Sequence, residues 1–174
     1  MEDQQQPKTG KFALNYGILL GAVSIVFGLM LYFLDMHYQQ ELSLLAVSIV
    51  IMLIVIIIGI NQFKKANGGY LSFGQGLKVG VGIALIGGII GMIYNLILTN
   101  VIDPDTAAKQ LEYAKGKMVA RGMTQEEISR QVEGMKMFSG PAIQIAMGLI
   151  FSLVLGFLLS LIPTLVMKKS ENAY

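Results

Sequence analysis

Few side chains in this chain could carry out chemistry. Asp35 and His37 form its only close pair of an acid and an imidazole, and His37 is its only histidine. One histidine cannot build a typical metal site, which takes several protein ligands. Cysteine is absent, so the chain has no disulfide, thiolate ligand or cysteine nucleophile. We therefore interpret Asp35 and His37 as part of a short polar loop, and we predict no catalytic residue, metal site or cofactor.

Gly74, Gly76 and Lys78 give the chain a superficial likeness to a phosphate-binding loop. The Walker spacing is missing, however, and no strand is expected before the glycines. An Asn-Gly-Gly turn comes before them, and Ser72 can cap a helix that begins there. We expect Lys78 to extend its ammonium group to lipid phosphates rather than to a nucleotide. The net charge of +2, without a basic stripe among aromatic residues, also argues against a nucleic-acid partner.

The elements that must position these residues are four long apolar runs, at about 12–34, 42–60, 79–102 and 142–167. Each is close to the roughly 20 helical residues that cross a bilayer core, and none contains Asp, Glu, Lys or Arg. Hydrophobic residues make up 54% of the chain and charged residues only 14%, whereas the helices of a soluble domain need a polar face. The sequence predicts an all-α integral membrane protein, in which a four-helix bundle forms a single membrane domain over residues 1–174.

The connection between the third and fourth runs predicts an extramembrane helical hairpin at about 105–138. Apolar residues at helical spacing form one seam on each expected helix: Ala107, Leu111, Ala114 and Met118 on the first, and Ile128, Val132 and Met135 on the second. Gly122 can end the first helix, and Thr124 with Glu127 forms a capping box for the second. We expect the two seams to pack on each other. An apolar face for a partner or for lipid is the alternative.

Small residues recur at four-residue spacing within three of the spans, which places them on one face of each helix. The residues predicted to pack helices are Gly17 and Gly21 in the first span, Gly80, Ala84 and Gly88 in the third, and Gly148, Ser152, Gly156 and Ser160 in the fourth. Such stripes let membrane helices approach closely. We expect packing within the bundle, and the alternatives are self-association through a spare stripe and a substrate path. The second span has no such string, so we expect it to be the most lipid-exposed.

Three polar side chains in the predicted spans are of particular interest: Asn15, Asn95 and Gln144. Asn95 and Gln144 should lie at similar depth, where a hydrogen bond between them would be worth about 0.6 kcal/mol. We expect them to hold helices together, with a polar binding pocket as the alternative. No carboxylate or basic side chain lies in mid-membrane, and proton relays and ion-coupled carriers normally need such groups. That absence weighs against such carriers but not against a passive pore.

Basic residues predict the orientation, because they favour the cytoplasmic side of a membrane. Lysines flank the predicted spans at both termini and in the second connection, namely Lys8, Lys11, Lys64, Lys65, Lys78, Lys168 and Lys169. The first connection has none. We therefore expect both termini in the cytoplasm. The third connection, with six basic and six acidic residues, conflicts with this assignment unless a folded hairpin escapes the rule.

Two segments carry a family resemblance. One is Gly-Gly-Tyr-Leu-Ser-Phe-Gly-Gln-Gly-Leu-Lys, which leads into the third span; the other combines the Asp-Pro start of the third connection with Gly-Met-Thr-Gln-Glu-Glu-Ile and Met-Lys-Met-Phe-Ser-Gly-Pro. Together with four spans, they resemble domain-of-unknown-function family 4199, small membrane proteins typical of Bacteroidetes. The resemblance implies a four-helix fold over nearly the whole chain and a bacterial cell (inner) membrane. It implies no catalytic residue, cofactor or substrate.

The sequence favours a non-enzymatic membrane protein. We expect an assembly, scaffold or regulatory component that lies in the lipid bilayer. It would bind a membrane-protein partner, or a second copy of itself, through its small-residue stripes or its hairpin. The alternative is a small transporter or pore, including one built as a homo-oligomer. A continuous polar cavity holding Asn15, Asn95 and Gln144 would favour transport, whereas a tightly packed bundle with an exposed hairpin face would favour the scaffold.

Overall fold

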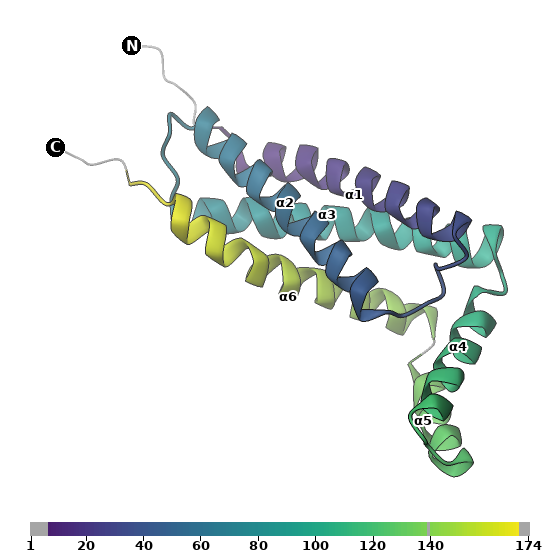
Figure 1. The fold of residues 1–174 in the computed structure, drawn as a ribbon. Coiled ribbons are helices and arrows are strands. Elements are labelled where there is room, and N and C mark those ends of the chain that lie inside the picture. The colour runs from purple at the N-terminus through teal and green to yellow at the C-terminus, as the bar shows by residue number, and fades with distance from the viewer. Residues whose placement is uncertain (1–6, 139, 171–174) are drawn as a thin grey trace.

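The computed structural model describes residues 7–138 and 140–170, so the first six and last four residues of the predicted domain, and residue 139, lie outside it. Helices make up the fold, in the order shown in Figure 1. Their bounds are α1 Thr9–Phe33, α2 Leu42–Ala66, α3 Phe73–Ile97, the π-helical turn η1 Leu98–Ile102, α4 Thr106–Ala120, α5 Gln125–Met137 and α6 Pro141–Met167. The prediction of an all-α fold is confirmed.

Four of these elements, α1, α2, α3 with η1, and α6, are long and apolar enough to cross a membrane, and the chain is a multi-pass membrane protein. The predicted bundle of four spans, with a helical hairpin between the last two, is confirmed. α2 and α3 extend further towards their shared connection than the apolar runs 42–60 and 79–102 do. Hydropathy marks only the hydrocarbon layer, whereas a helix can continue into the headgroup region, as α2 does at Lys64 and Lys65.

The two described ends of the chain and the α2–α3 connection lie together at one end of the bundle, which we call the terminal end (Figure 1). The α1–α2 connection and the α4–α5 hairpin lie at the opposite end, the hairpin end. A short antiparallel bridge fastens the terminal end, where the backbones of Leu71 and Lys169 exchange hydrogen bonds of 3.0 and 3.1 Å. Ser72 caps α3, as predicted, within a capping box that Gln75 completes.

α3 is the central helix, because it packs extensively against both α1 and α6. Towards the antiparallel α6 the contacts advance by four residues in each helix: Gly80 faces Ser160, Ala84 faces Gly156, Gly88 faces Ser152 and Met92 faces Gly148. Towards the parallel α1, Gly17 faces Ile86 and Gly21 faces Ile90. A Cβ atom added to Gly17 or Gly21 would lie 2.6 Å from those isoleucines. The stripes of small residues therefore contact helices of the same chain.

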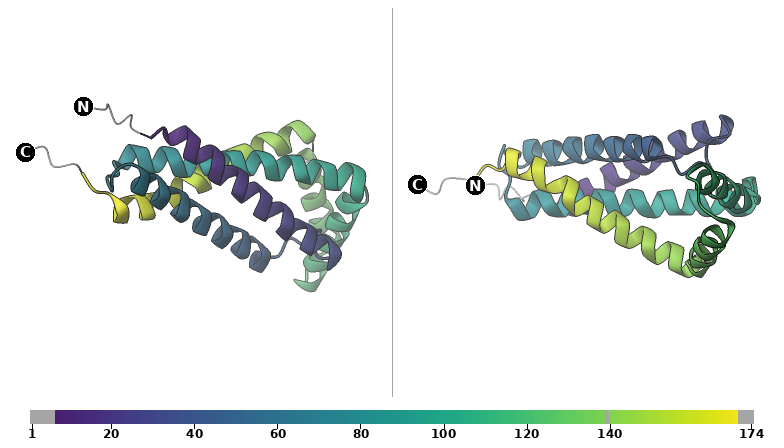
Figure 2. Two further views of the ribbon diagram at one scale, coloured as in Figure 1. Left: turned by 90° about the horizontal axis from the view of Figure 1, so that it is seen from above. Right: turned by 60° about the horizontal axis from the view of Figure 1, so that its bottom comes forward.

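The bundle has two halves that differ in packing. In the half near the terminal end, Ile56, Ile60 and Phe63 of α2 and Val79 and Ile83 of α3 are fully buried. In the other half, none of residues 22–33, 42–54, 88–97 and 142–155 is buried. There α2 and α6 diverge towards the hairpin end (Figure 2). We call these regions the closed half and the open half.

The expectation that the second span is the most lipid-exposed is wrong. A larger share of α2 than of α6 is buried, because α2 supplies large side chains that fill the closed half. Ile56, for example, would lie 3.2 Å from a Cβ atom on Gly80, so it occupies space that a small residue of α3 leaves. A span without a stripe of small residues can thus be the one that packs onto the small residues of its neighbours.

α4 and α5 pack on each other through three buried side chains and two neighbours: Met118, Ile128 and Val132, with Leu111 and Ala114. The capping box of Thr124 and Glu127 is as predicted, and so is the turn at Gly122, whose φ is +78°. The predicted seams are wrong at their ends, because Ala107 and Met135 are exposed. Both lie at the base of the hairpin, where each helix turns towards its own span.

Candidate functional site

Side-chain hydrogen bonds join distant segments at the hairpin end, between the connections. Nε2 of His37, in the α1–α2 connection, is 2.8 Å from Oδ2 of Asp103, which directly follows η1. Nζ of Lys109 in α4 is 2.8 Å from the same oxygen. The side chains of His37 and Asp103 are only 3% and 11% exposed. Because an ionised carboxylate only accepts hydrogen bonds, both nitrogens donate to it.

A second contact of the same kind lies beside the first. Glu41, the residue before α2, accepts hydrogen bonds from the hydroxyl of Tyr113 and from Nζ of Lys117, the latter at 2.7 Å. The ring of Tyr38 contacts both sites, with its centroid 5.4 Å from that of His37 and 6.1 Å from that of Tyr113. The residues of the two contacts form what we call the hairpin clamp: His37, Glu41, Asp103, Lys109, Tyr113 and Lys117.

The backbone around Asp103 explains why its carboxylate points to the clamp. The N–H of Asp103 donates to the carbonyl of Leu98 at 2.7 Å, which closes the π-helical turn at the end of the span. Pro104 cannot continue that ladder, because it has no N–H. The buried hydroxyl of Thr106 then donates to the carbonyl of Asp103 at 2.7 Å and starts α4. The backbone of Asp103 is therefore fixed by hydrogen bonds at both its N–H and its carbonyl.

Electrostatics keeps the clamp charged at neutral pH. The hydrogen bond from Lys109, helped by that from His37, lowers the pKa of Asp103 from 3.8 to about 2, although burial acts in the opposite direction. Hydrogen bonds from Lys117 and Tyr113 lower the pKa of Glu41. The same contacts raise the pKa values of Lys109 and Lys117. The ion pairs of the hairpin clamp can therefore hold α4 to the α1–α2 connection and to the end of η1.

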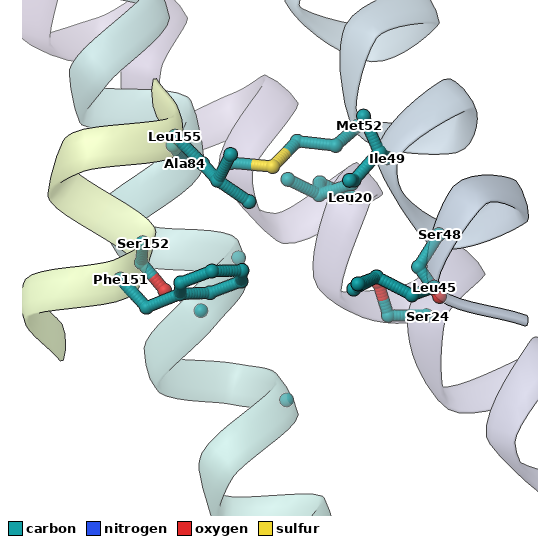
Figure 3. Close-up of a pocket in the computed structure, with 13 residues that line it drawn as sticks. Leu20, Ser24, Leu45, Ser48, Ile49, Met52, Ala84, Phe151, Ser152 and Leu155 are labelled. Carbon is teal, nitrogen blue, oxygen red and sulfur yellow. The ribbon is translucent and has the colours of Figure 1, made fainter. Parts of the chain in front are cut away.

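The open half contains a cavity of about 190 Å³ that all four spanning helices line, which we call the central cavity. Leu20 and Ala84, which are buried, lie at its end nearest the closed half. Ser152 of α6 lies on one side, and Ser24 of α1 and Ser48 of α2 lie on the other (Figure 3). Because large side chains fill the closed half, the cavity ends near the middle of the bundle.

The three predicted polar residues within the spans do not meet. Asn95 and Gln144 lie at similar depth, as predicted, and both line a groove between α3 and α6 in the open half, which we call the side groove. Gly91 lines both the side groove and the central cavity. Asn15 lies apart from them, exposed on α1 in the closed half. The hydrogen bond between Asn95 and Gln144 stays a prediction.

The sequence matches a protein family over most of its length. A model of the family described as "Protein of unknown function (DUF4199)" matches residues 15–169. The chain belongs to this family. The predicted family resemblance is thereby confirmed, and the match includes the hairpin clamp and every residue that lines the central cavity. No curated protein and no solved structure gives a significant match.

In this DUF4199 protein the hairpin clamp was not predicted from the sequence. His37 was grouped with Asp35, two residues away, but it pairs with Asp103, while Asp35 is exposed with a φ of +54°. One signal could have found the clamp. A polar stripe begins at Lys109 and continues at four-residue spacing through Tyr113 and Lys117, and the predicted topology puts it at the same end as residues 35–41.

Proposed function

We propose that this DUF4199 protein is a non-enzymatic scaffold of a bacterial inner membrane that displays the α4–α5 hairpin on the outer side to a protein partner. The observation that carries the proposal is the hairpin clamp. Ion pairs from Asp103 to Lys109 and from Glu41 to Lys117 hold α4 against the rest of the bundle. A hairpin held in place has less freedom to lose when it binds, which lowers the entropic cost of association.

The hairpin surface supports a protein as the partner. Lys115, Ser129 and Glu133 line a groove on the hairpin, and Val119 at the end of α4 is 56% exposed. Protein interfaces typically combine an apolar centre with a polar rim. Charges of both signs beside an exposed apolar side chain fit such an interface better than they fit the uniform surface of a membrane.

The distribution of charge supports an orientation with both termini in the cytoplasm. The α2–α3 connection carries Lys64, Lys65 and Lys78 at the terminal end. In the third connection, Lys109 pairs with Asp103, Lys117 with Glu41 and Arg130 with Glu126. A folded hairpin with paired charges conflicts less with the positive-inside rule than a loose basic loop would.

A transporter or pore, the alternative function, has less support. The central cavity ends at Leu20 and Ala84, and fully buried Ile56, Ile60 and Phe63 occupy the bundle beyond it. A path through a single chain would have to displace these side chains. A pore between several copies would instead need a polar outer face on a span, and the exposed residues of the spans are mostly apolar.

Site-specific photo-crosslinking tests the partner. A photoreactive residue at Glu133 on the hairpin should yield a discrete protein adduct in native membranes, because that position faces the proposed interface. The matched control is Val26 on the exposed surface of α1, which should yield no such adduct. Deleting residues 106–136 should leave membrane insertion intact but remove the partner. The same adduct from both positions, or none from Glu133, contradicts the proposal.

Single-cysteine labelling tests the orientation, because the chain has no native cysteine. Gly116 in the hairpin and Gly74 at the terminal end are both exposed, and a Cβ atom at either would meet nothing within 4 Å. In spheroplasts, a membrane-impermeant maleimide should label Gly116→Cys at once. It should label Gly74→Cys only after the membrane is opened. The reverse pattern would place the hairpin in the cytoplasm.

A further inference from the structure

The central cavity and the side groove lie end to end along the same faces of two helices. On α3, the lining residues Ala84, Gly88, Gly91 and Asn95 follow one another at three- or four-residue spacing, which keeps them on one face. Those of α6 share a face in the same way. Gly91 lies at the junction, and a Cβ atom placed on it would meet no atom within 4 Å. The path is therefore open where its two parts meet.

We propose that this path binds one acyl chain of a membrane lipid, with the polar linkage of its headgroup at Asn95 and Gln144. The central cavity, which is the part of the path nearer the closed half, is lined mainly by apolar side chains such as Leu20, Met52 and Phe151. The part towards the hairpin end carries two carboxamides. Carboxamides donate and accept hydrogen bonds without charge, so they suit the ester and hydroxyl groups of a lipid backbone.

The dimensions of the path suit a lipid chain. Ala84 and Asn95 are eleven residues apart on α3, which is about 16 Å at the helical rise of 1.5 Å per residue. One leaflet contributes half of a hydrocarbon core of ~30 Å. The central cavity of about 190 Å³ is also larger than the ~150 Å³ apolar cavity that holds a benzene molecule. A segment of acyl chain therefore fits in both length and volume.

The surroundings identify the bilayer as the source of the chain. α2 and α6 diverge at this level (Figure 2), and a lining side chain on each of them, Leu45 on α2 and Phe151 on α6, is exposed. The path is thus continuous with the surface that the lipid chains already cover. A transmembrane helix from a second copy is about 10 Å across with its side chains, so it would need far more space than the central cavity of about 190 Å³ provides.

Photoactivatable lipid tests the proposal with the full chain in nanodiscs. The probe is a phosphatidylcholine with a diazirine in the middle of one acyl chain. Fragment sequencing should locate several-fold more label on Met52 and Phe151 than on Val26, which lies on the exposed face of α1. Gly91→Leu should reduce this labelling several-fold, because its side chain fills the junction. Ala146→Leu adds similar bulk at an exposed position of α6 and should leave labelling unchanged.

A second pair of variants keeps the test valid if Gly91→Leu does not fold. Ser24→Leu narrows the central cavity from α1 and should reduce labelling of Phe151, whereas Ala22→Leu, two residues away and exposed, should not. Native mass spectrometry supplies an independent readout, since one lipid should remain bound to the wild-type chain and be lost from Ser24→Leu. Even labelling over all exposed faces, or equal labelling of both members of a pair, overturns the proposal.

Discussion

The closed half and the open half are built from the same four helices, yet among the described residues of these helices large apolar side chains are fully buried only in the closed half. In the closed half, α2 inserts Ile56 beside Gly80 of α3, which in turn faces Ser160 of α6. In the open half, α2 contributes Leu45 and Ile49 to the wall of a cavity instead. The stripes of small residues on α3 and α6 run through both halves, so they do not alone decide which half closes.

The difference shows that an apolar residue in a membrane has no need to be buried. In water, exposed apolar surface would be unfavourable by about 25 cal/mol per Å². Lipid tails solvate such surface about as well as a protein interior does, so helix association depends on close fit instead. The closed half has that fit because α2 supplies side chains of the right size. The open half can remain open because exposure to lipid carries no comparable penalty.

Gly80→Ala should give the largest effect and the sharpest contrast between the halves. Its Cβ atom would collide with Oγ of Ser160 and lie 2.7 Å from Cβ of that residue, so we expect a loss of roughly 1–3 kcal/mol in unfolding free energy. Gly91→Ala in the open half is the matched control. A Cβ atom at this position meets nothing within 4 Å. The helix preference of alanine should therefore raise the unfolding free energy, by at most ~1 kcal/mol. Unfolding in mixed micelles measures the free-energy change for both variants. Equal losses would contradict the difference in packing between the two halves.

Asp103→Asn should release the hairpin without loosening the closed half. The substitution preserves the shape of the side chain but removes the charge that Lys109 and His37 share. The rate of backbone amide hydrogen exchange in α4 should rise several-fold. The rate in the part of α3 that precedes Ala84, in the closed half, should stay unchanged. Glu112→Gln, at an exposed position of α4 outside the clamp, is the control and should behave as wild type. Faster exchange throughout the bundle would mean that the closed half depends on the clamp.

Acidification to about pH 2 should weaken the Asp103 contacts less than Asp103→Asn does, because about half of the Asp103 carboxylate is still ionised at that pH. The pKa of Asp103 is lowered from 3.8 to about 2, so its stabilising contribution is complete above pH 3.8 and is lost as the pH falls through about 2. The lowered pKa of Glu41 acts in the same direction. The mobility of a spin label on Gly116→Cys should therefore increase over this range. A label on Gly74→Cys reports on the terminal end and should not respond.

Gly148→Ala should give the smallest effect. Its Cβ atom would lie 3.5 Å from Sδ of Met92, an ordinary contact distance, so we expect no loss of unfolding free energy and, as at Gly91, a gain of up to ~1 kcal/mol from the helix preference of alanine. Gly148 belongs to the same stripe on α6 as Ser160, and only its place in the open half distinguishes it. The same unfolding assay measures the change. A loss as large as that of Gly80→Ala would show that the open half is as tightly packed as the closed half.

Local properties of the chain were predictable from its sequence, and contacts between distant segments were not. The spans follow from hydropathy, and the cap at Thr124 follows from three neighbouring positions. The burial of Ile56 depends on which neighbours α2 meets, which its own composition does not reveal. The contact of His37 with Asp103 depends on how far η1 carries the chain beyond α3. Asn95 and Gln144 could be predicted to lie at similar depth, because Asn95 is near the end of its span and Gln144 near the start of the next, antiparallel one.

The parallel contact of α1 with α3 has a consequence for biosynthesis. Gly21 faces Ile90, and the ribosome adds these two residues 69 positions apart. At about 5–20 residues per second, α1 waits roughly 3 to 14 s in the membrane before its main partner has been made. A face of glycine and alanine tolerates this interval because it presents no unsatisfied polar group to lipid. Charged residues at the same interface would be exposed to hydrocarbon throughout the delay, so the order of translation itself favours small apolar residues on the first helix.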